Sequence, residues 1–144
     1  MSDWKIPLYR IYTDEEDEKI VNKVIKRGNT WAIGEEIEKF EKTLSEFLGV
    51  KHCVVLNSGT SGLHAALLAH GIGNSDEVIV PSFSFISTAN SVLFVQGKPV
   101  FADIEEENFG LDPKSISEKI TSNTKAVMPM DYSGQSCRIF DIKK

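Results

Sequence analysis

The feature that most constrains the fold of this chain is an alternation of short apolar strands with helices from His52 onward. Such alternation requires right-handed β-α-β crossovers, which produce a mostly parallel sheet with helices on both faces. The sequence therefore predicts an α/β fold, in which ligands bind at the carboxyl ends of the strands. We expect strands at residues 52–56, 77–80, 99–102 and 125–128, and helices near 60–70, 85–96 and 113–120.

Two amphipathic helices are expected before this alternation. The first begins at a capping box formed by Thr13 and Glu16 and ends at Gly28, and the second covers residues 35–48. Together with an extended start at residues 6–9, they make residues 1–50 an N-terminal segment separate from the α/β domain of residues 51–144. Their apolar residues recur at helical spacing and are expected to face inward: Ile20, Val21, Val24 and Ile25 in the first helix, and Ile37, Phe40, Leu44, Phe47 and Leu48 in the second.

The loop Asn-Ser-Gly-Thr-Ser-Gly at residues 57–62 joins an expected strand, buried on both faces at residues 54–56, to a helix of small residues. Gly59 and Gly62 allow the backbone to turn sharply and a ligand to approach closely. The N–H groups of the first helical turn, with the serine and threonine hydroxyls, form a site for a phosphate. Ordinary helix capping by serine or threonine explains the same pattern, and the loop alone leaves both interpretations open.

Other nucleotide-binding motifs are absent from the sequence. No G-x-x-x-x-G-K-[ST] motif occurs, and Gly71-Ile72-Gly73 is followed by Asp76 where a dinucleotide-binding motif needs its third glycine. ATP and NAD are therefore disfavoured as ligands.

The charge, the cysteine and histidine content and the hydropathy of the chain exclude further classes of protein. The formal net charge of -5 leaves no basic patch for nucleic acid. Cys53 and Cys137 are too few for a disulfide scaffold and too distant for a metal knuckle, and the three histidines lack ligand spacing, so we expect no metal. No apolar run is long enough to cross a membrane, and residues 1–5 do not resemble a signal peptide. We expect a soluble, cytoplasmic protein.

Two phenylalanines follow the strand expected at residues 77–80. The stretch PSFSFISTAN places Phe83 and Phe85 beside hydroxyl groups in a loop. An aromatic side chain there can stack on a planar ring beside the phosphate. A buried core position is the alternative, and it is the one we expect for Phe83.

Several segments in register resemble the family of PLP-dependent sugar aminotransferases called the DegT/DnrJ/EryC1/StrS family. The resemblance rests on IPLYRIYTDEEDEKIVNKVIKRG, on WAIGEEIEKFEKTLSEFLGVKHCVVLNSGTSGLHAALLAHGIGNSDEVIVPSFSFISTANSVLFVQGKPVFADIEEENFGLDP and on TKAVMPMDYSGQ. Their order and spacing are similar to those of the first third of the family. The resemblance implies that residues 51–144 are an incomplete PLP-binding large domain of the fold-type I transferases.

The resemblance also implies roles for individual residues. In the family, the loop that matches Ser58, Gly59, Thr60 and Ser61 holds the phosphate of pyridoxal 5′-phosphate (PLP), and the aromatic residue that matches Phe85 packs on the pyridine ring. Residues Trp31, Gly34 and Tyr132 resemble regions that line the sugar-nucleotide pocket.

The activity implied for a full-length parent is amination of a nucleotide-linked keto-sugar, with glutamate as the amino donor and a homodimer as the assembly. Transamination needs a lysine that holds the cofactor and an acidic partner for the pyridinium nitrogen. Neither matches a position before Lys144, so no catalytic residue is assigned in this chain. We expect it to be inactive alone and to self-associate through uncovered apolar surface.

Two alternatives remain open from the sequence. Some relatives carry a histidine instead of the lysine and dehydrate a deoxysugar on the same N-terminal architecture. A truncated, non-catalytic module that binds phosphate compounds is the second alternative. We favour the aminotransferase over both.

Overall fold

The computed structural model describes residues 5–6 and 9–144. The chain forms two compact units, Met1–Val55 and Leu56–Lys144, which are taken separately below. Of the extended start expected at residues 6–9, Pro7 and Leu8 lie outside the described residues. In the part of the chain that is described, no helix is long and apolar enough to cross a membrane.

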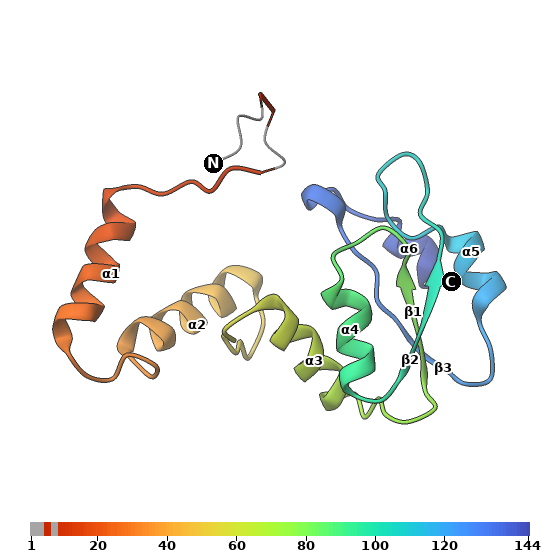
Figure 1. The fold of residues 1–144 in the computed structure, drawn as a ribbon, viewed down its shortest axis with the longest axis horizontal. Helices are drawn as coiled ribbons and strands as arrows, with labels where there is room; N and C mark the ends of the chain where they lie inside the picture. The colour runs from red at the N-terminus through yellow and green to blue at the C-terminus, as the bar shows by residue number, and fades with distance from the viewer. Residues whose placement is uncertain (1–4, 7–8) are drawn as a thin grey trace. The chain divides into compact units, whose positions relative to one another are not determined.

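The first unit contains helices α1, Glu15–Arg27, and α2, Glu35–Leu48 (Figure 1). The capping box predicted at Thr13 and Glu16 is wrong by one residue. Asp14 caps α1 instead, because its carboxylate accepts from the N–H groups of Glu16 and Asp17, and Asp17 accepts in return from the N–H of Asp14 at 3.0 Å. An aspartate is a better N-cap than a threonine, which explains the shift.

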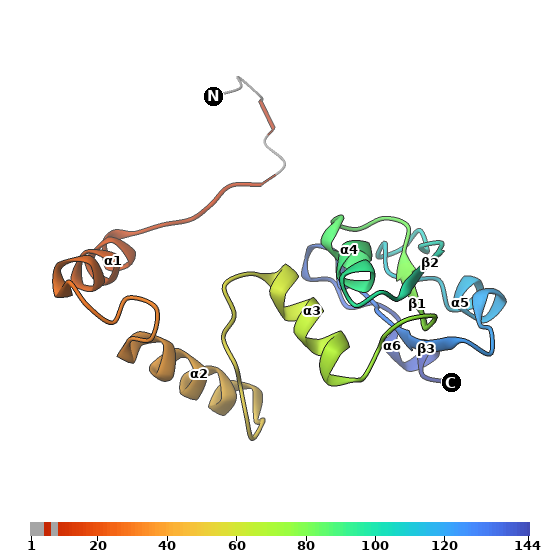
Figure 2. The same cartoon turned by 60° about the horizontal axis from the view of Figure 1, so that its bottom comes forward.

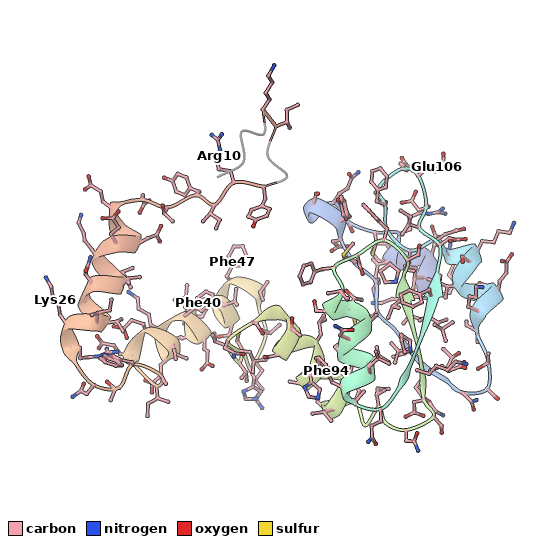
Figure 3. All side chains as sticks on the ribbon, viewed as in Figure 1. Arg10, Lys26, Phe40, Phe47, Phe94 and Glu106 are labelled. Carbon is pink, nitrogen blue, oxygen red and sulfur yellow. The ribbon has the colours of Figure 1, made fainter. Side chains whose placement is uncertain are left out.

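The expected inward faces of these helices are not buried. No residue of α1 or α2 is buried, and Phe40 and Phe47, which extend from α2 in Figure 3, are 54% and 83% exposed. Helical periodicity indicates which side of a helix can be buried, whereas burial itself needs a covering surface. The prediction of the two helices is therefore confirmed, and the prediction that these faces are covered is wrong for this chain.

The strand expected at residues 52–56 is also absent. These residues join no strand of the described sheet, and Val54 and Leu56 are 73% and 45% exposed. The N–H of Val55 donates to Oε1 of Glu41 at 2.9 Å instead of to a neighbouring strand. A β-strand is defined by its ladder partner, and an apolar run does not reveal whether that partner is present.

The second unit is built on a three-stranded parallel sheet of order β2-β1-β3. Its strands are β1, Glu77–Pro81, β2, Lys98–Ala102, and β3, Thr124–Val127. Its helices are α3, Gly59–Ala69, α4, Ser87–Phe94, α5, Pro113–Lys119, the short 3-10 turn η1, Tyr132–Gly134, and α6, Ile139–Ile142. The sequence predicted all of these except η1 and α6. Asp112 caps α5, because its side chain accepts from the N–H of Lys114.

Helices cover both faces of this sheet, as predicted. Val78 and Val80 of β1 pack in one apolar cluster with Leu67 of α3 and Val92 of α4. Ile79 belongs to a second cluster, which includes Ile116 of α5 and is extended by Ile142 of α6. Figures 1 and 2 show α3 and α4 on one side of the sheet and α5 and α6 on the other. Successive side chains of a strand alternate between faces, so the central strand β1 is buried on both.

The connections place one group of loops at the carboxyl edge of the sheet. A short turn joins the end of α3 to the start of β1. Helix α3 packs beside α4, with the rings of His64 and Phe94 edge to face at 5.6 Å. The loops that follow β1, β2 and β3 reach the same edge, since the strands are parallel.

Candidate phosphate-binding site

The predicted phosphate loop lies at the start of α3. Ser58 has extended backbone and is the N-cap, because its Oγ accepts from the N–H of Ser61 at 3.1 Å. The N–H of Gly62 donates to the carbonyl of Ser58 at 3.1 Å and closes the first turn. The capping interpretation is therefore correct for Ser58, and it leaves the other donors of the turn available.

Three donors at the start of α3 have no acceptor among the described residues. They are the N–H groups of Gly59 and Thr60, which no carbonyl can reach in the first helical turn, and the hydroxyl of Thr60. The first turn of α3 carries no acidic residue, whereas α1 and α2 each have acidic side chains there. Uncompensated donors at the positive end of a helix dipole are suited to an anion.

The two glycines of the loop, Gly59 and Gly62, do not have the backbone conformation that was predicted. Neither Gly59 nor Gly62 has left-handed backbone, so the expected sharp turn at these residues is wrong. They lie within the regular first turn of α3, where ordinary helical backbone is sufficient. A Cβ built on Gly59 would meet no atom within 4 Å, so the space on that side of Gly59 is open.

The loop between β1 and α4 carries the predicted ring-stacking residue. Phe85 is 73% exposed and follows β1 at the carboxyl edge of the sheet. Phe83, which we expected in the core, is 47% exposed, so that prediction is wrong. Its ring instead lies 5.0 Å from the ring of Tyr132, because two loops from neighbouring strands meet there.

Phe83 and Tyr132 belong to an aromatic cluster that includes Phe109. The ring of Phe109 lies 6.2 Å from that of Phe83 and 5.8 Å from that of Tyr132. Phe109 has a left-handed backbone with φ of 59°, which is uncommon for a bulky residue. The sequence did not single out Phe109, and the only available signal was its place in the loop after a parallel strand.

The remaining predicted residues, Trp31 and Gly34, lie in the first unit. Trp31 is 65% exposed in the connection between α1 and α2. Gly34 is buried as the N-cap of α2, and a Cβ there would collide with the side chains of Arg27 and Glu36, which form a 2.9 Å ion pair. Local packing therefore accounts for the glycine, and a role in substrate binding stays a prediction.

The loop after β3 has one carboxylate and one thiol with shifted pKa values. The N–H of Cys137 donates to Oδ1 of Asp131 at 2.9 Å and holds the pKa of Asp131 below its ordinary value. Burial raises the pKa of the Cys137 thiol, so this thiol stays protonated at neutral pH.

Within residues 5–6 and 9–144, no three histidine, cysteine or acidic side chains form a metal-binding group.

The fold defines an α/β protein with helices on both faces of a parallel sheet, and folds of this class bind ligands at the carboxyl edge of the sheet. More specifically, the fold is that of PLP-dependent transferases of fold type I, as predicted. The chain belongs to the DegT/DnrJ/EryC1/StrS aminotransferase family, whose model matches residues 12–144.

Three related proteins illustrate the match. The chain is 46% identical over 110 residues to the GDP-perosamine synthase of Caulobacter vibrioides, covering 75% of this chain and 30% of that protein. It is 36% identical over 121 residues to the UDP-2-acetamido-2-deoxy-3-oxo-D-glucuronate aminotransferase of Pseudomonas aeruginosa, covering 84% and 33%. The structure of NtdA from Bacillus subtilis with bound cofactor PMP is 36% identical, has a TM-score of 0.82 and is matched over 91% of this chain and 31% of its own. The chain thus spans about a third of the length of these relatives.

Proposed function

We propose that this chain supplies the cofactor-phosphate site of a PLP-dependent aminotransferase that acts on a nucleotide-linked keto-sugar. The observation that carries the proposal is the set of three donors, from Gly59 and Thr60 at the start of α3, that have no acceptor within residues 5–6 and 9–144. The PMP bound in a solved relative supports a phosphorylated pyridine cofactor.

The residues of the loop fit such a group. The N–H groups of Gly59 and Thr60 and the Thr60 hydroxyl donate to the phosphate oxygens, and the Ser58 and Ser61 positions complete the turn. The exposed ring of Phe85 packs on the flat face of the pyridine ring and excludes water from it. When bound, PLP supplies an electron sink for the amino-transfer chemistry.

The substrate and the missing catalytic groups are further parts of the proposal. A relative named for a UDP-linked 3-oxo-sugar and another named for a GDP-sugar support a nucleotide-linked keto-sugar. Glutamate is proposed as the amino donor. Trp31, Gly34 and Tyr132 are proposed to contact this substrate. We propose a cytoplasmic homodimer in which the cofactor-binding lysine belongs to a longer parent protein, because the chain spans about a third of its relatives.

Titration of the 144-residue chain with inorganic phosphate and with PLP tests the site. We expect the backbone amide signals of Gly59 and Thr60 to shift and saturate in ¹H–¹⁵N NMR spectra. Gly59→Ala places a methyl group in the open space and should weaken both ligands without unfolding α3, whereas Gly73→Ala is the matched control, since its Cβ also meets no atom. Unchanged amide signals in the unmodified chain would contradict the proposal.

The activity is tested separately, with the parent protein and the chain side by side. Given PLP, glutamate and UDP- or GDP-linked keto-sugars, the parent should release 2-oxoglutarate, and the 144-residue chain should release none. Release of 2-oxoglutarate by the chain would contradict the assignment of the lysine to another part of the parent. A parent that eliminates water from the sugar without consuming glutamate would replace the aminotransferase by the dehydratase.

A further inference from the structure

The hydroxyl hydrogens of the phosphate loop can be assigned from the hydrogen bonds. The Ser61 hydroxyl donates to Oδ1 of Asn57 at 2.7 Å, because that carbonyl oxygen can only accept. The Oγ atoms of Ser58 and Ser61 are 3.0 Å apart, and the single Ser61 hydrogen is already used. Ser58 is therefore the donor of this contact, while its Oγ accepts from the N–H of Ser61.

This assignment divides the loop into two kinds of residue. The hydroxyl hydrogens of Ser58 and Ser61 are both used in a chain of hydrogen bonds that ends at Asn57, so neither is left for a ligand. The Thr60 hydroxyl and the N–H groups of Gly59 and Thr60 take no part in this chain. The loop thus separates the groups that set its shape from the groups that face an anion.

We propose that Asn57 is a positioning residue of the phosphate site, which acts through the Ser61 hydroxyl on the Ser58 cap. The proposal rests on the phosphate-binding function proposed above and removes Ser61 from the side-chain ligands that the resemblance suggested. By orienting Ser61, Asn57 holds the first turn of α3 in the geometry that presents Gly59 and Thr60 together. The ligand class is a phosphate or phosphomonoester dianion.

The chemistry of Asn57 suits this role better than that of an acid. An amide oxygen accepts the Ser61 hydrogen without adding negative charge to the start of α3, where an anion is to bind. Asn57 lies outside the helix and is exposed, so its side chain contributes little to the core of the unit. Preorganisation of a loop by such a contact increases affinity by lowering the ordering cost of binding.

A set of matched variants of the full 144-residue chain tests the proposal with inorganic phosphate as the probe. The dissociation constant is read from the amide shifts of Gly59 and Thr60. We expect Asn57→Ala and Ser61→Ala each to raise Kd about tenfold, as expected for the loss of one positioning contact. The double variant should also show about a tenfold rise, because both changes break the same chain.

Two controls separate positioning from general stability. Ser61→Thr keeps the hydroxyl and should retain a Kd within about twofold of the unmodified chain. Asn74→Ala removes an exposed asparagine in the turn after α3 and should leave Kd unchanged. Urea unfolding of every variant is measured in parallel, since a purely structural role would lower stability without changing Kd.

The outcomes distinguish this proposal from the function on which it rests. Saturable phosphate binding with an unchanged Kd in Asn57→Ala, or with effects that multiply to about a hundredfold in the double variant, would overturn the role of Asn57 alone. The absence of saturable binding to the unmodified chain would overturn the phosphate site itself.

Discussion

Glu77 and Lys98 form an ion pair across the first rungs of the parallel sheet, with Nζ of Lys98 2.8 Å from Oε1 of Glu77. Glu77 is only 6% exposed, and its second oxygen accepts from the hydroxyl of Thr121. These groups therefore tie the start of β1 to β2 and to the segment that leads into β3. The hydrogen bond from Lys98, followed by that from Thr121, holds the pKa of Glu77 below its ordinary value.

This pKa shift predicts the pH dependence of stability. The pKa of Glu77 is lower in the folded chain than in the unfolded chain, where it has its ordinary value of 4.5. The ionised Glu77 therefore stabilises the folded chain above pH 4.5, and this stabilisation is lost as pH falls through the pKa of the folded chain. Urea unfolding from pH 7 to pH 3 should show a steeper loss for the unmodified chain than for Glu77→Gln. The other carboxylates with lowered pKa values are present in both proteins, so the difference between them reports on Glu77 alone. Parallel curves of unfolding free energy against pH would contradict the prediction.

Thr60→Val tests the ligand role of the Thr60 hydroxyl. Valine keeps the shape of the side chain and removes a hydrogen bond to a charged group worth about 1.5–3 kcal/mol, so Kd for phosphate should rise about tenfold or more. Thr43→Val, an exposed threonine of α2, is the matched control and should leave Kd unchanged. An equal Kd in both variants would remove Thr60 from the site.

Phe85→Leu separates ring stacking from phosphate binding. An aromatic contact contributes about 0.5–1.5 kcal/mol, so the affinity for PLP should fall severalfold while that for inorganic phosphate stays the same. The free energy of unfolding should change by less than about 0.5 kcal/mol, because the ring is 73% exposed. Phe140→Leu, at an 83% exposed position, is the control. Equal losses for both ligands would indicate a distorted loop rather than a lost stacking surface.

Gly110→Ala tests the contact between the loops that follow β2 and β3. A Cβ on Gly110 would lie 2.7 Å from Cβ of Cys137 and 2.8 Å from Oδ1 of Asn108, which is too close for either atom. Overpacking of this kind costs about 1–3 kcal/mol of unfolding free energy, measured with urea. Gly73→Ala should remain within about 0.5 kcal/mol of the unmodified chain, and a similar value for Gly110→Ala would contradict the close contact.

Self-association should follow from the uncovered apolar faces of α1 and α2. Ile25 and Phe47 are 61% and 83% exposed on these helices, and contiguous exposed apolar surface favours association. Sedimentation velocity should therefore show a mass that rises with protein concentration, and Phe47→Glu should reduce it more than Thr43→Glu on the same helix. A monomer at every concentration would contradict the prediction.

Predictions that depend on residues close together in the sequence were more often correct than predictions that depend on residues far apart. The bounds of α2 were predicted correctly, because helical periodicity depends on residues within one or two turns. The strand at residues 52–56 and the core position of Phe83 were wrong, because both depend on partners distant in the sequence. For the proposed phosphate site, the loop pattern pointed to Gly59 and Thr60, whereas the proposal for Asn57 needed the hydrogen bonds.

The sequence by itself determined the local elements, the order of strands and helices, and the family. It did so because alternating apolar patterns and turn residues act over short distances, and because parallel strands need helical crossovers. Only the tertiary structure decided which faces are covered, how Glu77 pairs with Lys98, and which hydroxyl of the loop at residues 57–62 has no partner among the described residues. Each of these features depends on where individual side-chain atoms lie after the chain has packed, and no local sequence pattern fixes those positions.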